Sequence, residues 1–358
     1  MAHLNIARER LHNQLIADST FDKPGDVVKW FGAVQAQDYL GALWAVGLRT
    51  PNATESAIEQ ALANRTIVRT WPMRGTLHFV AADDVRWMLS LLTPRVLAGS
   101  ASRWKQLELD EATFFKSRKT IERALQGGKQ LEREEMYQVL EAARISTVGQ
   151  RGIHILGRLA QEGVICFGAR AGKQHTFVLL DDWMPNSKRM ERDAALAELV
   201  KRYFASHGPA TLQDFVWWSG LATTDAREGL ELAKAHLVQE IVAGQTYWLV
   251  SSTPSAQAKR QAAYLLPGFD EYLVGYKDRS AVLDPQFVKQ TNAGGGMLNP
   301  IIVINGQVVG TWKRTLQKDS VGITPSWFTT PTKSDQRAIE TAVQQYGTFL
   351  ELSSVLVL

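Results

Sequence analysis

One arrangement of predicted helices and hairpins recurs three times along the chain, without close residue identity between the copies. In each copy, helical segments precede a two-stranded hairpin whose tip carries small or basic residues. A recurring supersecondary unit constrains the fold more than any single segment does. This arrangement is typical of a winged-helix unit. The sequence therefore predicts a mainly α protein with β wings, in the α+β class, built from three tandem winged-helix units.

The first copy is predicted within residues 1–125. Its hairpin turns at Pro72-Met73-Arg74-Gly75, because proline and glycine favour turns. A helix over residues 56–64 precedes the two strands of this hairpin, which cover residues 66–71 and 76–80. Two earlier segments, residues 26–34 and 40–48, are helical or extended.

The second and third copies are predicted within residues 126–190 and 191–258. The second has two helices and then two strands, over residues 132–143, 151–162, 164–167 and 176–180. The third has three helices and then a hairpin turn, over residues 194–206, 212–219, 225–235 and 243–245. Asp225, three residues before Glu228, is predicted to form a capping box at the start of the third helix.

Residues 259–358 differ in character from the three copies. The apolar segments 301–304 and 307–309 flank Asn305-Gly306, which is a strong signal for a tight hairpin. A small β-rich module is therefore predicted, followed by a helix over residues 334–346. The glycine-rich stretch 292–296 lacks a following Gly-Lys-Ser/Thr, so it is interpreted as a flexible connection rather than a phosphate loop.

Composition limits the remaining classes of protein. A chain of 358 residues exceeds one ordinary domain of about 100–200 residues, and 45% hydrophobic with 21% charged residues is typical of a fully folded protein. A net charge of +4 favours a polyanionic partner but does not establish one. Because Cys166 is the only cysteine, an intrachain disulfide and a thiolate metal cluster are excluded.

We expect no metal and no cofactor. The seven histidines are scattered, and neither a His-Glu-x-x-His motif nor a nucleotide-cofactor motif occurs. No apolar run approaches the ~18 residues of a membrane span. The N-terminus lacks the apolar core of a signal peptide. The expectation is a cytoplasmic protein that has no membrane partner and acts as a monomer.

The helix predicted from Arg151 is amphipathic. At 3.6 residues per turn, one face is basic and carries Arg151, His154 and Arg158. The opposite face is apolar and carries Ile153, Leu156 and Leu159. Such a helix can lie against phosphates, and a solvated amphipathic helix is the alternative reading.

Two predicted hairpins also present basic residues. The hairpin after the Arg151 helix carries Arg170 and Lys173 at its tip, which favours nucleic acid as the partner. The first hairpin carries Arg69, Arg74 and His78. An arginine at a wing tip can enter a minor groove or clamp a phosphate. For His78, a structural role within the strand is the alternative.

Other charged segments allow two readings each. The last helix of the third copy mixes acidic and basic residues, which predicts an architectural role for that copy. Lys313 and Arg314 either face DNA or solvate an edge strand. Asp270 and Glu271 are either catalytic carboxylates or part of a structural ion-pair network that joins the β-rich module to the winged units.

Four separated motifs resemble one family. They are Phe31-Gly-Ala-Val-Gln-Ala-Gln-Asp38, Arg74-Gly-Thr-Leu-His78, Leu265-Leu-Pro-Gly-Phe-Asp-Glu-Tyr272 and Gly310-Thr-Trp-Lys-Arg314. In this order they resemble the AlkZ/YcaQ-like winged-helix DNA glycosylases of bacteria. The resemblance implies three winged-helix units and a small β-barrel around a DNA channel. It also implies hydrolysis of the N-glycosidic bond of alkylated purines, including crosslinked ones.

The family's catalytic signature falls on Gln35-Ala36-Gln37. Two glutamines are the form that the resemblance associates with unhooking of interstrand crosslinks; here alanine occupies the apolar position between them. An N7-alkylated purine is cationic and leaves readily, so glutamine carbonyls that hold a water and stabilise the sugar cation suffice. Glutamine cannot act as a general base, so neutral damaged bases are predicted to be poor substrates.

Geometry sets a condition on these glutamines. Residues 35 and 37 would point about 200° apart in a helix, whereas they share a face in an extended segment. The Gln35–Gln37 segment is therefore predicted to be non-helical. Asp38 has either an electrostatic role or a capping role. The leading prediction is a monofunctional DNA glycosylase that binds double-stranded DNA with alkylated purines; a non-catalytic DNA-binding regulator and a protein-binding adaptor are the alternatives.

Overall fold

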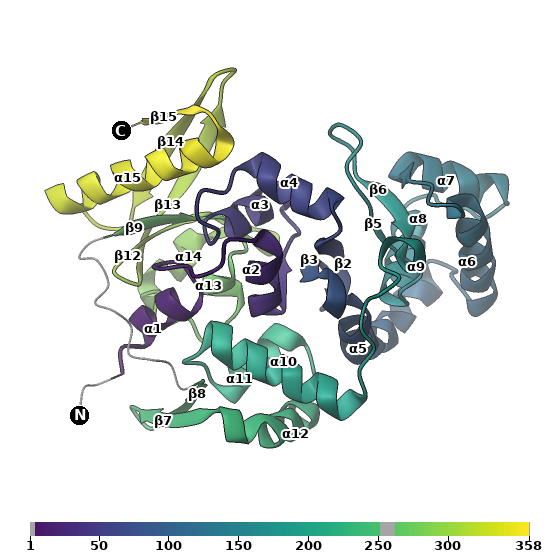
Figure 1. Cartoon of the computed structure of the whole chain (residues 1–358), viewed down its shortest axis with the longest axis horizontal. Helices are drawn as coiled ribbons and strands as arrows, with labels where there is room; N and C mark the ends of the chain where they lie inside the picture. The colour runs from purple at the N-terminus through teal and green to yellow at the C-terminus, as the bar shows by residue number, and fades with distance from the viewer. Residues whose placement is uncertain (1–3, 251–261, 358) are drawn as a thin grey trace. The chain divides into compact units, whose positions relative to one another are not determined.

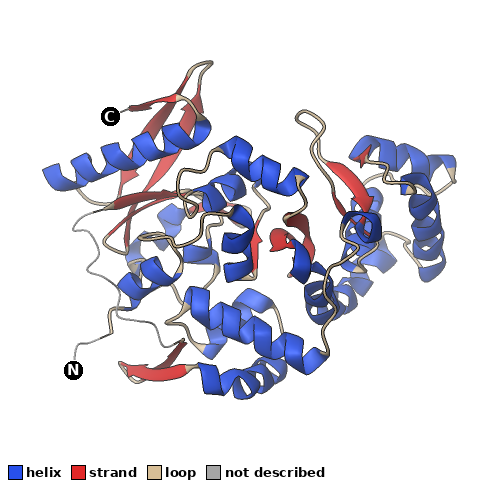
Figure 2. Cartoon of the chain, viewed as in Figure 1, coloured by secondary structure: helices blue, strands red, loops and turns tan. Residues whose placement is uncertain are grey.

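The computed structural model describes residues 4–250 and 262–357, and its chain forms two compact units. Unit 1 combines Met1–Glu59, Leu196–Trp218 and Ala222–Leu358, and unit 2 combines Gln60–Ala195 and Ser219–Leu221. Figure 1 labels the helices and strands along the chain. Figure 2 shows that both helices and strands contribute widely, so the chain is an α+β protein. None of the helices within the described residues is long and apolar enough to span a membrane.

A five-stranded sheet dominates the C-terminal part of unit 1. Its strand order is β15-β14-β13-β12-β9, and the strands are β9 (Ala263–Leu266), β12 (Ile301–Ile304), β13 (Gln307–Leu316), β14 (Ser320–Trp327) and β15 (Ser353–Leu356). Neighbouring strands are antiparallel except β14 and β15, which are parallel. Helix α15 (Lys333–Leu350) connects these two and packs on β9 and β15.

The β12–β13 hairpin turns at Asn305-Gly306, as predicted. Both residues have positive φ, 52° at Asn305 and 82° at Gly306, which is the backbone conformation of a type I′ turn. This turn matches the right-handed twist of the flanking strands, so the short loop fixes their register.

Helices and short strands supply the rest of unit 1. Along the chain from residue 4, the first elements are α1 (Ile6–Asn13), α2 (Pro24–Phe31), β1 (Ala33–Gln35), α3 (Tyr39–Gly47) and α4 (Glu55–Ala63). The later elements are α10 (Arg192–His207), α11 (Leu212–Ser219), α12 (Thr223–Ala233), β7 (Val238–Val242), β8 (Gln245–Leu249), α13 (Glu271–Val274), α14 (Val288–Thr291), β10 (Asn292–Gly294) and β11 (Met297–Leu298). Tyr203, Phe215 and Trp218 form an aromatic core within this unit.

Unit 2 alternates helices with short strands. Its elements are β2 (Ile67–Met73), β3 (Thr76–Ala81), α5 (Val85–Gln106), α6 (Glu111–Leu125), β4 (Leu131–Glu132), α7 (Arg133–Ala142), α8 (Arg151–Gln161), β5 (Ile165–Phe167), β6 (Thr176–Leu179) and α9 (Leu180–Trp183). Strands β2 and β3 form an antiparallel hairpin, and β4, β6 and β5 form a second small sheet. Apolar side chains from α6, α7 and α8 close the core against this sheet.

Several predicted elements are confirmed. The hairpin turns at Arg74-Gly75 and Ala243-Gly244 lie where the sequence predicts them. The predicted helices over 151–162, 212–219 and 334–346 correspond to α8, α11 and α15. The predicted division into four regions stays a prediction, and its boundary at residues 258 and 259 lies outside the described residues.

Two local predictions are wrong. Asp225 does not begin α12, because this helix starts at Thr223 after Ala222, so the predicted capping box is not the N-terminus. The glycine-rich stretch 292–296 is not only a connection: β10 and β11 pair there in a short hairpin. Its three glycines have positive φ, which lets the chain reverse within a few residues.

Candidate active site

The Gln35–Gln37 segment is a turn between a strand and a helix. Strand β1 ends at Gln35 and α3 begins at Tyr39, with no helix between them. The predicted non-helical conformation is therefore confirmed. Gln35 is buried, whereas Gln37 is exposed to solvent.

Gly32 starts this turn. It follows the last residue of α2 with a φ of +79°, a conformation that L side chains rarely adopt. A Cβ built there would already contact the Trp218 ring, at 3.8 Å. The glycine thus ends α2 and turns the chain directly into β1.

Asp38 ends the turn as the N-cap of α3. Its backbone is extended, and its Oδ1 accepts a hydrogen bond from the Gly41 N–H at 3.3 Å. A Cβ at Gly41 would lie 2.5 Å from Asp38 Oδ2, so glycine leaves room for the cap. The structure therefore gives Asp38 a capping role, one of the two roles that its sequence position predicts.

Glu271 lies directly behind Gln35. Its side chain is 1% exposed, and its Oε1 accepts a hydrogen bond from the Gln35 backbone N–H at 2.9 Å. Its Oε2 accepts from the Trp218 indole N–H at 2.9 Å and contacts His207 Nε2 at 3.2 Å. A buried carboxylate is stable only with such donors, so this contact set accounts for the burial of Glu271.

His207 completes the contacts of Glu271. Burial lowers the pKa of His207, although hydrogen bonding to Glu271 and the charge of Glu271 act in the opposite direction. The neutral ring then donates from Nε2 to the carboxylate, and its Nδ1 lies 2.8 Å from the Ser206 hydroxyl oxygen. Its ring stacks on Tyr203 with centroids 4.6 Å apart, which fixes its orientation.

Asp270, the neighbour of Glu271, pairs with Arg49. Both oxygens of Asp270 accept from the guanidinium at 2.8 Å, and both side chains are buried. Arg49 also donates to the carbonyls of Gln14 and Ala45, each at 2.8 Å. Asp270 and Glu271 therefore belong to a buried structural network within unit 1, the second of the two roles predicted for them.

A small cavity of about 60 Å³ adjoins this turn. Asp38 and Gly41 form one side of it, and Trp44, Trp312, Arg314 and Tyr346 form much of the rest. Arg314 donates to the Tyr346 hydroxyl, so its guanidinium is held against the aromatic wall.

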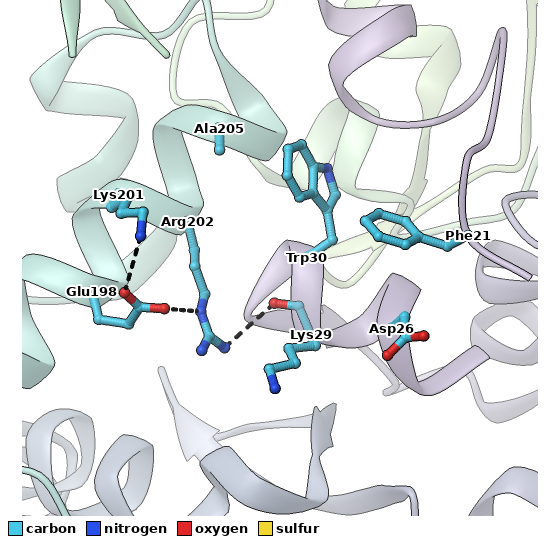
Figure 3. A pocket seen from close by; sticks show the side chains of 8 residues that line it. All are labelled: Phe21, Asp26, Lys29, Trp30, Glu198, Lys201, Arg202 and Ala205. Carbon is cyan, nitrogen blue, oxygen red and sulfur yellow. Dashed lines mark hydrogen bonds and ion pairs between the residues drawn. The ribbon is translucent and has the colours of Figure 1, made fainter. Parts of the chain in front are cut away.

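A larger open pocket of about 270 Å³ lies between α2 and α10 (Figure 3). Phe21 and Trp30 form its aromatic side, and Glu198, Lys201 and Arg202 approach from α10. The Arg202 guanidinium is already 2.8 Å from Glu198 and also donates to the Lys29 carbonyl. None of the residues that line this pocket was predicted as a site residue.

A family model described as "DNA glycosylase AlkZ-like" matches residues 28–349. The chain belongs to this family. A curated relative, "Interstrand DNA cross-link repair glycosylase" from Streptomyces sahachiroi, is 27% identical in an alignment of 351 residues that covers 92% of this chain and 92% of the relative. The solved structure of Streptomyces sahachiroi DNA glycosylase AlkZ aligns with a TM-score of 0.76 over 99% of this chain and 98% of that chain, at 24% identity. The two proteins thus share a fold.

In this AlkZ-like chain, the basic residues of the first hairpin are largely enclosed. Arg69 is 6% exposed, and its guanidinium lies 4.8 Å from the centre of the Phe167 ring. Arg74 lies at the turn with a φ of 54°, and its guanidinium is 3.3 Å from His78 Nε2. His78 is fully buried and donates from Nδ1 to the Thr76 carbonyl at 3.0 Å. These contacts fit a structural role for His78, which is the alternative that the sequence left open.

The basic face of α8 is engaged within unit 2. Arg158 contacts Glu111 through two hydrogen bonds of 2.8 and 2.7 Å and Glu162 through one of 2.7 Å. Its guanidinium also lies over the Phe114 ring, 4.1 Å from the centre. Arg151 donates to the Ser146 carbonyl at 3.0 Å. Burial lowers the pKa of His154, so this ring is neutral near pH 7. Its predicted DNA role stays a prediction.

The predicted apolar face of α8 needs one correction. Leu156 and Leu159 are fully buried as predicted, but Ile153 is 38% exposed and Ile155 is the buried isoleucine. The apolar face is therefore centred one residue later than the sequence pattern indicates.

Among the predicted DNA contacts, Lys173 and Lys313 are exposed, and Arg170 and Arg314 are half-buried. Sequence reasoning missed His207 and Trp218, which meet Glu271 from α10 and α11. Their separation of more than fifty residues from Glu271 gives no local pattern; the Asp270-Glu271 pair was the available signal. Within residues 4–250 and 262–357, no group of three or more potential ligands is placed to hold a metal ion.

Proposed function

We propose that this chain is a monofunctional DNA glycosylase that hydrolyses the N-glycosidic bond of cationic N7-alkylated purines in double-stranded DNA. The observation that carries the proposal is the non-helical Gln35–Gln37 turn in a chain of the AlkZ-like DNA glycosylase family. Gln35 and Gln37 are the proposed catalytic residues.

The chemistry uses uncharged groups. Loss of the cationic purine leaves positive charge on the sugar, and glutamine carbonyl oxygens stabilise this charge and orient the attacking water. The purine carries its positive charge before reaction, so it needs no general acid to leave. The water loses its proton to solvent only after its oxygen has bonded to the sugar cation, because the bond to the cation makes that proton acidic.

Crosslinked purines are a proposed further substrate. The curated relative is named for interstrand crosslink repair, and this chain aligns with 92% of it. The exposed Gln37 is compatible with a lesion that stays bulky on one side, because a crosslinked base cannot swing freely into an enclosed pocket.

We also propose the architecture that the sequence predicts, with winged-helix units in residues 1–125, 126–190 and 191–258 and a β-rich, barrel-like module in residues 259–358. The hairpins β2–β3, β5–β6 and β7–β8 each follow helices, which supports three wings. The proposed DNA contacts are Lys173, Lys313, Arg170, Arg314, Arg74, Arg69, Arg151 and His154, whereas Arg158 and His78, whose side chains have partners within unit 2, are proposed as structural residues. The enzyme is proposed to act as a monomer on chromosomal DNA of the cytoplasmic nucleoid, without a cofactor.

A base-release assay tests the proposal. The enzyme is incubated in excess with a duplex that contains one 7-methylguanine, and the free base is quantified. We expect release of 7-methylguanine and a strand that breaks only after hot alkali. The double variant Gln35→Ala, Gln37→Ala should release base at least about 100-fold more slowly while its DNA affinity is retained.

Three outcomes would contradict the proposal. Sequence-specific DNA binding without base release would favour a regulator, and no salt-dependent DNA affinity would favour a protein-binding adaptor. Strand cleavage before alkali would contradict monofunctional chemistry.

A further inference from the structure

We propose that Glu271 is a positioning residue that holds the catalytic turn through the backbone N–H of Gln35. The inference rests on the proposed function of Gln35 and Gln37, but the contact itself can be measured without activity. Glu271 touches no reacting atom in this proposal and acts through the conformation of the turn.

The carboxylate is oriented from several sides. Oε1 accepts from the Gln35 N–H at 2.9 Å, while Oε2 accepts from Trp218 at 2.9 Å and from His207 at 3.2 Å. Trp218 comes from α11 and His207 from α10, so two helices fix the oxygen that does not face the turn. Both rings are fully buried, and the carboxylate has little room to rotate.

The preceding residue, Asp270, holds the other end of the same chain segment. Asp270 pairs with Arg49, which lies two residues beyond the end of α3, and α3 begins two residues after Gln37. Adjacent residues of one short segment therefore contact both ends of residues 35–49. The turn cannot shift relative to α3 without breaking one of these buried charged contacts.

A charged acceptor suits this position better than a neutral one. A carboxylate has no hydrogen to donate, so both oxygens can face donors at once. An amide in its place has one oxygen and one NH2 group, and the NH2 group would face either Gln35 or the Trp218 and His207 donors. Glu271→Gln therefore keeps the volume but loses at least one contact.

The test compares Glu271→Gln with a matched control. Asp214 is also a buried carboxylate of unit 1, and it accepts backbone N–H bonds from Lys277 at 3.0 Å and Asp278 at 3.1 Å. Asp214→Asn removes a similar buried charge from a carboxylate that holds the backbone of residues 277 and 278. For each folded variant, single-turnover release of 7-methylguanine, duplex affinity and hydrogen–deuterium exchange of the Gln35 amide are measured.

We expect Glu271→Gln to slow base release about 100-fold, because a small misplacement of a catalytic group has a cost of that size. Duplex affinity should change less than about threefold, and the Gln35 amide should exchange at least about tenfold faster. Asp214→Asn should leave the Gln35 exchange and the base-release rate of folded enzyme within about threefold of the parent. Wild-type rate and exchange in folded Glu271→Gln would overturn the inference.

If Glu271→Gln does not fold, Trp218→Phe is the second variant that tests the inference. It keeps an aromatic ring in the core but removes the indole donor to Oε2. Slower release with retained DNA affinity and faster Gln35 exchange is expected, and a parental rate and exchange would overturn the inference. If the parent enzyme releases no base, the proposed function fails, and the exchange data alone still decide whether Glu271 holds the turn.

Discussion

Arg158 and Lys173 show how the surroundings of a charge decide its role. Both belong to the basic surface predicted from the sequence. The side chain of Arg158 is 13% exposed and paired with two glutamates, whereas Lys173 is exposed near the tip of the β5–β6 hairpin. A cation that already neutralises carboxylates gains little from a phosphate, while an exposed lysine releases a counterion on binding.

Arg158→Ala and Lys173→Ala should therefore differ in effect. Arg158→Ala should lower the free energy of unfolding by about 1–2 kcal/mol, through lost hydrogen bonds and ring contacts. Lys173→Ala should leave stability unchanged and reduce the slope of log affinity against log salt by about 0.9. Urea unfolding and DNA titrations at several salt concentrations measure both effects. A stable Arg158→Ala variant with a reduced salt slope would contradict this assignment.

His175 should make stability depend on pH. Burial, together with Arg69, Arg170 and Arg133, lowers the pKa of His175 to about 4. The unfolded chain therefore takes up a proton near pH 6.5 while the folded chain does not. The free energy of unfolding should fall as pH decreases from 6.5 to about 4, by up to about 1.4 kcal/mol per pH unit from this residue.

His175→Gln should remove this part of the slope. Urea unfolding midpoints at pH 7.5, 6 and 5 compare the variant with the parent. An unchanged slope in the variant would show that the folded and unfolded chains bind the His175 proton alike.

At the scale of elements, close packing between α3 and α15 depends on a glycine. A Cβ at Gly47 would lie 2.2 Å from the buried ring of Phe349. In contrast, a Cβ at Gly99, inside α5, would meet no atom within 4 Å. The same substitution should therefore have opposite effects in the two helices.

Gly47→Ala should destabilise the protein by about 1–3 kcal/mol, because overpacking outweighs the better helix propensity of alanine. Gly99→Ala should stabilise it by about 0.5–1 kcal/mol. Thermal and urea unfolding of both variants provide the measurement. Stabilisation by Gly47→Ala would mean that Phe349 can move aside at little cost.

The elements that the sequence predicts well have strong local signals. Asn305-Gly306 fixes one hairpin, and the apolar period fixes α8 and α15. Helix α5 was not predicted, because Pro94 and Gly99 disfavour a helix locally; burial of Trp87 and Leu92 compensates. The parallel pairing of β14 and β15 depends on contacts across α15, which no short window of sequence contains.

Part of the candidate site could likewise be predicted from the sequence, and part of it could not. Gln35 and Gln37 were found through a family motif, and their non-helical conformation followed from the requirement that they share a face. Glu271 was recognised as part of a charged pair, but its contact with Gln35 joins residues 236 positions apart. Only tertiary packing creates that contact, so the sequence could not predict that Glu271 accepts a hydrogen bond from Gln35.

At the scale of the whole molecule, the charge of the base determines which lesions the proposed site can release. A site that presents uncharged amides, without a proposed general acid, can release only a base that already carries positive charge. The family membership explains why the target is DNA, and in the proposed mechanism the charge of the leaving base explains why glutamine suffices.

The most direct test compares two duplexes that differ only in this charge. One contains 7-methylguanine, which is cationic, and the other contains 7-methyl-7-deazaguanine, which has the same methyl group but is neutral. Single-turnover release is measured with excess enzyme on each. The account predicts release of 7-methylguanine and release of the neutral base at least about 100-fold more slowly, with similar affinity for both duplexes. Release of both bases at similar rates would contradict it.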